Sequence, residues 1–209
     1  MAPLVLIHGG LWDDTTADRF WRRTGVLDTL AHHGVEVHTP DRLPRASSWI
    51  AEAVHLMTLL PPRAGTLVGA SNGCSAAVRL ALARPDLVAA LLLTWPATAG
   101  DPDVDASLHA TLDSLGARTA EVSQLLDGQT LRGVSDAELS GLRVPVGVIP
   151  AMPADRHHQR GTVDALLARV PQARELPGCP TPTAPNFPAH LPGFVGTVLG
   201  FVHDRVPGP

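Results

Sequence analysis

The chain has 209 residues, of which 44% are hydrophobic, and its formal net charge at neutral pH is -4. This length and this apolar content predict one domain with a sizeable core. The slight acidic excess, without any run of arginines, argues against a basic surface for nucleic acid or for an anionic membrane. A small molecule is therefore the expected partner, with no nucleic acid and no membrane, and the protein is expected to be a monomer or a homodimer.

The cysteine pattern and the N-terminus bear on the cellular compartment. Cys74 and Cys179 lie far apart and match neither a disulfide framework nor a metal-ligand spacing, so both are predicted to be free thiols. No metal and no cofactor is implied. The apolar run Leu4 to Ile7 is too short for an export signal, and no longer run could span a bilayer. We expect a cytoplasmic protein.

Short, continuous apolar segments recur along the chain and predict strands that are buried on both faces. They span residues 3–7, 35–40, 66–70, 88–95, 144–149 and, more weakly, 173–176. Between them, apolar residues recur every three to four positions at 20–33, 49–60, 74–83 and 162–170, as in helices packed on a sheet. The alternation predicts an α/β fold with an open, mostly parallel six-stranded sheet and helices on both faces.

One segment breaks this alternation. Residues 100–142 are rich in Asp, Ser, Thr and Gly and hold at most two short helices, at 105–115 and 120–128. Within a single domain over residues 1–209, this segment is predicted to be a small lid-like insertion over the carboxyl edge of the sheet, where ligands bind in such folds. The proline-rich stretch 178–192 is expected to be a loop ahead of a last helix at 193–203.

The clearest motif is Gly69-Ala70-Ser71-Asn72-Gly73, which fits the pattern G-x-S-x-G. A predicted strand enters it and a predicted helix leaves it, which is the strand-turn-helix setting of a nucleophile elbow. Both glycines are needed because a β-carbon at either position would collide across so tight a turn. Ser71 is therefore the predicted nucleophile.

A serine that attacks a carbonyl needs N–H donors for the oxyanion that forms. The backbone N–H of Asn72, at the start of a helix, is one predicted donor. The other is that of Gly10, because His8-Gly9-Gly10 follows the first strand and its glycines let the backbone approach a substrate. His8 is expected to brace this oxyanion loop.

Four stretches together resemble the α/β-hydrolase fold family in order and spacing: LVLIHGGLWDD at 4–14, TPDR at 39–42, LVGASNGCSA at 67–76 and VPVGVIPAMPAD at 144–155. The resemblance covers residues 3–201. It implies a compact, six-stranded version without the family's first hairpin, because the oxyanion loop already begins at residue 8. It also implies that serine, acid and histidine follow one another in this order along the chain.

The resemblance places the acid just beyond the strand after the insertion, where Asp155 lies. Its carboxylate would orient an imidazole and stabilise the charged form of that ring. A surface aspartate that caps the following helix is the alternative interpretation of this residue. The further candidates for the acid are Asp101, Asp103, Asp105 and, less favoured, Glu175.

The histidine departs from the family pattern. The matching stretch is residues 184–188, with Asn186 where histidine is usually found, and an amide cannot take and return a proton near neutral pH. His190, four residues on in the same predicted loop, is the preferred replacement. His157 and His158 are the alternative bases, and adjacent positions point in different directions, so at most one of the two would face the site.

These residues predict a serine esterase: a hydrolase that acts on an ester, lactone or thioester of a small apolar molecule through an acyl-enzyme on Ser71. Leu11 and Trp12 follow the His8-Gly9-Gly10 loop and Trp95 ends the predicted strand after the elbow, so these three are expected to line the substrate pocket. Core packing is the alternative interpretation of the two tryptophans. The alternative is a non-hydrolytic protein of the same fold, either a ligand-binding relative that has lost its base or a lyase or cyclase.

Overall fold

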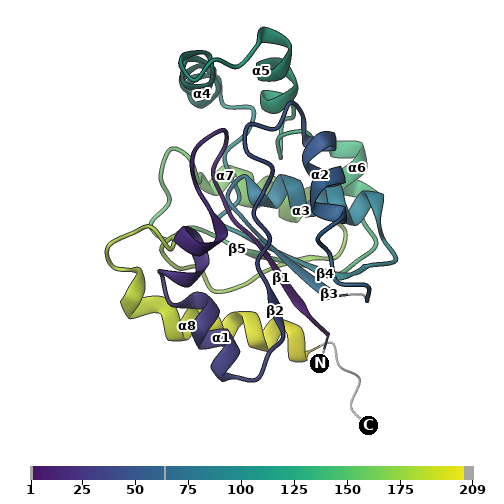
Figure 1. Cartoon of the computed structure of the whole chain (residues 1–209), viewed down its shortest axis with the longest axis vertical. Helices are drawn as coiled ribbons and strands as arrows, with labels where there is room; N and C mark the ends of the chain where they lie inside the picture. The colour runs from purple at the N-terminus through teal and green to yellow at the C-terminus, as the bar shows by residue number, and fades with distance from the viewer. Residues whose placement is uncertain (1, 64, 205–209) are drawn as a thin grey trace.

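The computed structural model describes residues 2–63 and 65–204 and confirms the predicted open sheet. Within these residues six parallel strands are arranged in the order β2-β1-β3-β4-β5-β6 (Figure 1). Their bounds are β1 Leu4–Ile7, β2 Val37–His38, β3 Gly65–Ala70, β4 Val88–Thr94, β5 Val146–Ile149 and β6 Ala173–Glu175. The chain adds β2 on one side of β1 and β3 on the other. The carboxyl ends of the neighbouring strands β1 and β3 therefore lie where the strand order reverses, which is where ligands bind in such sheets.

Helices cover both faces of the sheet because both faces are apolar. The π-helix η1 (Asp18–Arg22), α1 (Val26–His32) and α8 (Phe187–His203) pack on one face, and α2 (Trp49–Met57), α3 (Gly73–Ala83), α6 (Asp136–Ser140) and α7 (Arg160–Arg169) pack on the other. Along β1 the side chains alternate: Leu4 and Leu6 belong to the first core, and Val5 and Ile7 to the second. This is the period of two that a strand imposes.

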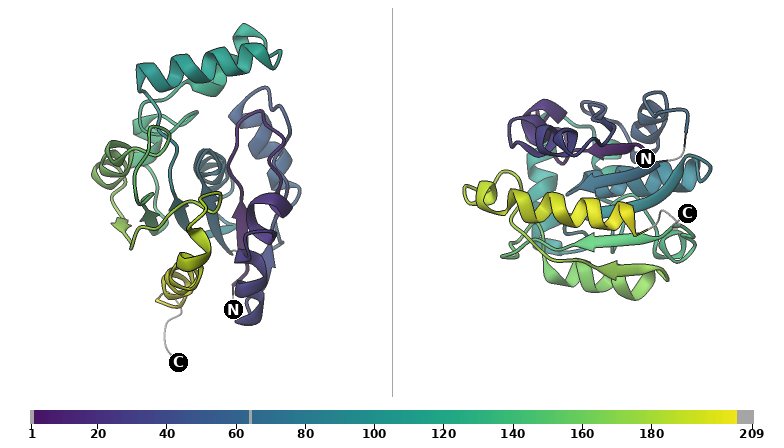
Figure 2. Two further views of the ribbon diagram at one scale, coloured as in Figure 1. Left: turned by 90° about the vertical axis from the view of Figure 1, so that its left-hand side faces the viewer. Right: turned by 90° about the horizontal axis from the view of Figure 1, so that it is seen from below.

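The segment between β4 and β5 carries α4 (Pro102–Ser114) and α5 (Thr119–Leu126) as well as α6. Figures 1 and 2 show α4 and α5 at one end of the molecule, apart from the helices that flank the sheet. Buried Leu112, Val122 and Leu125 join the two helices to the core around α2 and α3. In the part of the chain that the structure describes, no helix is long and apolar enough to cross a membrane.

Three helices differ from the sequence expectation. Residues 100–142 hold α6 in addition to the two short helices predicted there, so the expectation of at most two was wrong. The helix predicted over residues 20–33 is divided at Gly25, whose φ of 81° has the left-handed sign that breaks a helix. The last helix begins at Phe187 rather than at Gly193. Pro188 fits the first turn, where a backbone N–H has no partner in the helix, and buried Phe187 packs against Trp95 and Phe194.

Candidate active site

The predicted nucleophile lies on a strained turn between β3 and α3. Ser71 has a φ of 52°, in the left-handed region that few non-glycine residues adopt, and its N–H donates to the Thr94 carbonyl of the neighbouring strand at 3.0 Å. A β-carbon on Gly69 would lie 2.6 Å from the Gly73 carbonyl oxygen, and one on Gly73 would lie 2.5 Å from the His8 carbonyl oxygen. Both glycines are therefore required by close backbone contacts.

The imidazole next to this serine is that of His158. Its Nε2 lies 3.0 Å from the Oγ of Ser71, which is hydrogen-bonding distance. His158 belongs to the loop between β5 and α7, beyond the carboxyl end of β5, and its side chain is 15% exposed. A general base must lie within hydrogen-bond reach of the proton it takes, and His158 meets this condition.

The other nitrogen of this ring faces the predicted acid. The Nδ1 of His158 lies 3.2 Å from each carboxylate oxygen of Asp155. Because a carboxylate only accepts hydrogen bonds, Nδ1 carries the proton in this pairing and Nε2 is left to accept from the Ser71 hydroxyl. The backbone N–H groups of His157 and His158 also donate to Oδ1 of Asp155, at 2.7 and 2.9 Å. One loop therefore supplies both the acid and the imidazole.

The pKa of Asp155 lies below its ordinary value. Partial burial acts to raise it, but the hydrogen bond and the charge of His158, together with the two backbone N–H groups, outweigh burial and stabilise the ionised form. The carboxylate is 54% exposed, so solvent screens the pairing with His158. Asp155 is therefore ionised at neutral pH, as a residue that orients an imidazole has to be.

The connection between β4 and α4 holds this loop in place. The Thr98 N–H donates to the His157 carbonyl at 2.7 Å, and the Thr98 Oγ1 accepts from the Gln159 N–H at 2.9 Å. The Gln159 side chain in turn donates to Asp101, at 3.0 Å. Since Thr98 is buried, the loop that carries Asp155 and His158 is hydrogen-bonded to a buried residue of the connection that follows β4.

The remaining candidate acids have other partners. Asp101 accepts hydrogen bonds from the first N–H groups of α4 as its N-cap, Asp105 pairs with buried Arg132, and Glu175 pairs with Arg160. Asp103 is exposed, and its carbonyl accepts a hydrogen bond from Arg156. The structure brings Asp155, and none of these four, into contact with the imidazole at Ser71.

The preferred base of the sequence analysis does not reach Ser71. His190 is the fourth residue of α8, exposed, and absent from the lining of the cavity at Ser71. The physical reason is that α8 begins at Phe187, so residue 190 is fixed in a helix and not carried by a loop. Asn186 is the exposed N-cap of the same helix. The imidazole hydrogen-bonded to Ser71 Oγ is that of His158 and not that of the other alternative, His157, whose pKa is lowered by partial burial and by Arg156.

The predicted oxyanion loop lies directly against the nucleophile. A β-carbon on Gly9 would lie 3.1 Å from the Cβ of Ser71, and Gly10, with a φ of 89°, lines the same cavity as Ser71 and His158. Asn72 is the N-cap of α3, so its N–H stands at the positive end of the helix dipole. The Asn72 N–H therefore adjoins Ser71 and Gly10 lines the same cavity, and their role as oxyanion donors stays a prediction.

His8 braces this loop, as expected, through both of its ring nitrogens. The Gly9 carbonyl can only accept, so Nδ1 donates to it, at 2.8 Å, and Nε2 accepts from the Arg42 N–H, at 3.1 Å. The pKa of His8 is lowered by burial first and by the charge of Arg42 second. His8 is thus neutral, which is the form that both hydrogen bonds require.

A cavity of about 430 Å³ opens at Ser71 and His158. Aromatic rings and polar groups share its wall, which is formed by Gly10, Phe20 and Trp95 with Asp13, Asp14, Thr15, Arg19, Thr181 and Thr183. In residues 2–63 and 65–204 there is no group of three or more His, Cys, Asp or Glu side chains that could hold a metal ion.

Of the three residues predicted to line the pocket, the structure brings only Trp95 to this cavity. Its ring stacks on Phe194 at 5.0 Å between centroids, and its Nε1 donates to the Cys179 carbonyl. Leu11 and Trp12 pack against the core around α2 and α3 instead. The reason is local: Trp12 has a φ of 59°, and its Nε1 donates to the Ala46 carbonyl, away from Ser71.

A buried ion pair that the motifs above do not predict lies behind the predicted oxyanion loop, between Arg42 after β2 and Glu52 on α2. A signal for it is present in the sequence. Glu52 follows Trp49 by three positions and precedes Leu56 by four, so it falls on the apolar stripe of its helix. A carboxylate on such a stripe needs a buried cationic partner.

Comparison with known proteins gives sequence and structural relatives. No protein-family profile matches the chain. The lipase LipV from Mycobacterium tuberculosis is 38% identical over 112 residues, covering 48% of this chain and 39% of that lipase. The aligned part therefore spans well under half the length of that relative.

Solved structures match over almost the whole chain. NosK from Streptomyces actuosus covers 98% of this chain and 100% of its own, with a TM-score of 0.66 and 22% identity. MGS-MChE2, described as an alpha/beta hydrolase enzyme from the metagenome of lagoon sediments in Morocco, covers 98% of this chain and 91% of its own, with a TM-score of 0.68 and 18% identity. With the six-stranded parallel sheet and its flanking helices, these likenesses show that the chain has the α/β-hydrolase fold.

Proposed function

We propose that the protein is a serine hydrolase that cleaves an ester, lactone or thioester of a small molecule through an acyl-enzyme on Ser71. One observation carries the proposal: Nε2 of His158 lies 3.0 Å from the Oγ of Ser71, while Nδ1 of the same ring contacts Asp155. A nucleophile, a base and a residue that orients the base are the three parts that this chemistry needs.

The reaction follows from these contacts. The Oγ of Ser71 adds to the carbonyl carbon, its proton passes to Nε2 of His158, and the carbonyl π-electron pair moves onto oxygen. The N–H groups of Gly10 and Asn72 stabilise this oxyanion. Collapse of the adduct expels the alcohol or thiol, which takes the proton from His158, and leaves an acyl group on Ser71. Water, deprotonated by the same ring, then releases the acid.

The cavity limits the size and character of the substrate. Its volume of about 430 Å³ suits a small molecule. Phe20 and Trp95 offer aromatic surface for the apolar part of the substrate that the sequence analysis anticipated. Thr15, Thr181 and Thr183 add hydroxyl groups that can orient a polar substituent. The relatives described as a lipase and as an alpha/beta hydrolase enzyme support hydrolysis as the type of reaction.

The alternative of a ligand-binding relative without a base rests on the asparagine at position 186, whereas the lyase or cyclase alternative stays a prediction. The imidazole of His158, within hydrogen-bonding distance of Ser71, supports a protein that has kept a base. Asn186 is the N-cap residue of α8 and does not line the cavity at Ser71.

The test is hydrolysis of short-chain p-nitrophenyl esters together with labelling by an alkyl fluorophosphonate. We expect turnover and labelling by the wild type, both lost in Ser71→Ala. Ser75→Ala is the matched control, since Ser75 is a buried serine one helical turn further along α3. A folded wild type that neither turns over esters nor takes up the probe contradicts the proposal, as does labelling that persists in Ser71→Ala.

A further inference from the structure

Arg42 and Glu52 form an ion pair that is almost completely shielded from water. Their side chains are 7% and 1% exposed, and the guanidinium donates to both carboxylate oxygens, with 2.9 Å between Nη2 and Oε2. The guanidinium also lies over the ring of Trp49, 5.7 Å from its centroid. The planar fork of Arg42 is thus held in one orientation by the carboxylate and by the ring.

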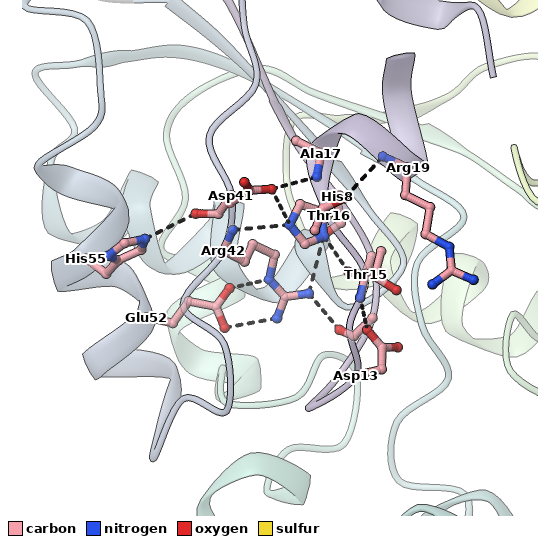
Figure 3. A network of polar contacts seen from close by, with 12 residues as sticks. His8, Asp13, Thr15, Thr16, Ala17, Arg19, Asp41, Arg42, Glu52 and His55 are labelled. Atoms are coloured by element: carbon pink, nitrogen blue, oxygen red, sulfur yellow. Dashed lines mark hydrogen bonds and ion pairs between the residues drawn. The ribbon is translucent and has the colours of Figure 1, made fainter. Parts of the chain in front are cut away.

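The Nη1 group of this guanidinium faces the predicted oxyanion loop, residues 8–10 (Figure 3). Nη1 of Arg42 donates to the Gly10 carbonyl at 2.6 Å and to the His8 carbonyl at 3.3 Å. The carbonyl between them, that of Gly9, accepts from His8 Nδ1, and His8 Nε2 accepts from the backbone N–H of Arg42. The Arg42 side chain therefore binds the first and third of three successive carbonyls, and His8, which accepts from the Arg42 backbone, binds the second.

The hydrogen bonds to these three carbonyls fix the directions of the N–H groups in the loop. In a trans peptide the carbonyl and the N–H point in opposite directions. The Gly9 carbonyl and the Gly10 N–H belong to one peptide unit, so the hydrogen bond to His8 directs the Gly10 N–H away from His8. Gly10 lines the cavity at Ser71. Successive N–H groups turned to one side of a loop form a concave site for an anion.

We propose that Arg42 is a positioning residue for the oxyanion hole: its side chain fixes the peptides on either side of the one that carries the Gly10 N–H, so that this N–H is aimed at the oxyanion formed on attack by Ser71. The inference rests on the proposed hydrolase function and adds a residue that touches no substrate. It also gives a reason for the ion pair. Burying two charges costs desolvation energy, and apolar residues of similar size often replace such a pair without loss of stability.

The experiment separates geometry from charge with two variants. Arg42→Lys keeps the positive charge beside Glu52 but cannot bind a carboxylate and two carbonyls with one planar fork. The double variant Arg42→Met with Glu52→Leu removes both charges at similar volume and leaves no unpaired charge in the core. For each, kcat and KM are measured with p-nitrophenyl butyrate, and the inhibition constant with a short alkyl trifluoromethyl ketone, whose adduct on Ser71 carries an oxyanion.

We expect kcat to fall by about 10- to 100-fold in both variants, less than the full loss of one oxyanion donor, with little change in KM. The inhibition constant of the ketone should rise by a similar factor, because the adduct resembles the transition state. Arg79→Lys is the matched control. Arg79 also binds both a carboxylate, that of Glu138, and a carbonyl, that of Gly133, but away from the cavity at Ser71.

The outcomes are distinguishable. If wild type is neither active nor labelled by the fluorophosphonate, the proposed function fails and this inference falls with it. If wild type is active and folded Arg42→Lys keeps its kcat and its affinity for the ketone, the positioning role is wrong while the hydrolase proposal stands. A loss of the same size in Arg79→Lys would show a general effect of stability, and would also contradict the inference.

Discussion

Asp155 and His158 contact each other from positions three residues apart in one loop, with Nδ1 of the imidazole 3.2 Å from each carboxylate oxygen. The same carboxylate accepts the N–H groups of His157 and His158, so the backbone of the turn fixes the acid relative to the ring. In the family that the sequence resembles, the histidine is expected after the last strand. In this chain the loop after β5 provides both groups.

Asp155→Asn tests whether the carboxylate orients the imidazole. The amide oxygen can still accept the two backbone N–H groups, so the turn is kept, but the amide does not favour the same ring tautomer or stabilise the protonated ring. We expect kcat to fall by on the order of 10³- to 10⁴-fold, with little change in melting temperature. Steady-state kinetics and thermal unfolding of the same sample check this, and an almost unchanged kcat would rule the role out.

The close backbone contacts at the elbow predict a stability effect. Gly73→Ala sets a β-carbon 2.5 Å from the carbonyl oxygens of Ile7 and His8, so β1 or α3 must shift. We expect the free energy of unfolding to fall by about 1 to 3 kcal/mol, as for an overpacked core.

The control for this substitution is Gly200→Ala in α8, where an added β-carbon meets no atom within 4 Å. Alanine there should stabilise the helix by about 0.5 to 1 kcal/mol. Urea denaturation of both variants measures the two changes, and the prediction fails if Gly73→Ala is as stable as wild type.

The buried ring of His8 predicts a pH dependence of stability. Its pKa in the folded protein lies below the ordinary value of 6.5, because burial and Arg42 disfavour the charged form. The unfolded chain therefore takes up a proton first as the pH falls. The stability that the neutral ring contributes is fully present above pH 6.5, the ordinary pKa of histidine. It is lost as the pH falls from that value toward the lowered pKa of His8.

His8→Asn removes this titration while leaving an amide that can donate to the Gly9 carbonyl. Urea midpoints measured between about pH 7.5 and about pH 5 should fall more steeply for wild type than for the variant. Parallel curves for the two proteins would show that His8 does not contribute to the pH dependence.

Much of the fold could be predicted from the sequence because its signals are local. Buried strands appear as short continuous apolar runs, and each of the six predicted runs overlaps one strand. The elbow is also predictable from a local pattern, because the two glycines that its close backbone contacts require lie within two residues of Ser71. The start of α8 differs from the prediction because a proline-rich stretch is typical of a loop, whereas Pro188 fits a first helical turn and Phe187 packs in the aromatic core.

The part of the site that was not predicted depends on contacts between distant segments. No pattern in the sequence tells whether His158 or His190 approaches Ser71, because the choice depends on the turn that Asp155 caps and on the hydrogen bonds of Thr98. The position of Glu52 on the apolar stripe of its helix predicts a buried cationic partner, but no local pattern tells that this partner is Arg42. A lid role for residues 100–142 stays a prediction.

The central claim is that His158 activates Ser71, and fluorophosphonate labelling of His158→Ala beside His190→Ala tests it most directly. Both substitutions remove one imidazole, and each histidine lies outside the apolar core, so both variants should fold. The account predicts that His158→Ala labels on the order of 10³-fold or more slowly than wild type, while His190→Ala labels at the wild-type rate. Normal labelling of His158→Ala together with loss of labelling in His190→Ala would contradict it.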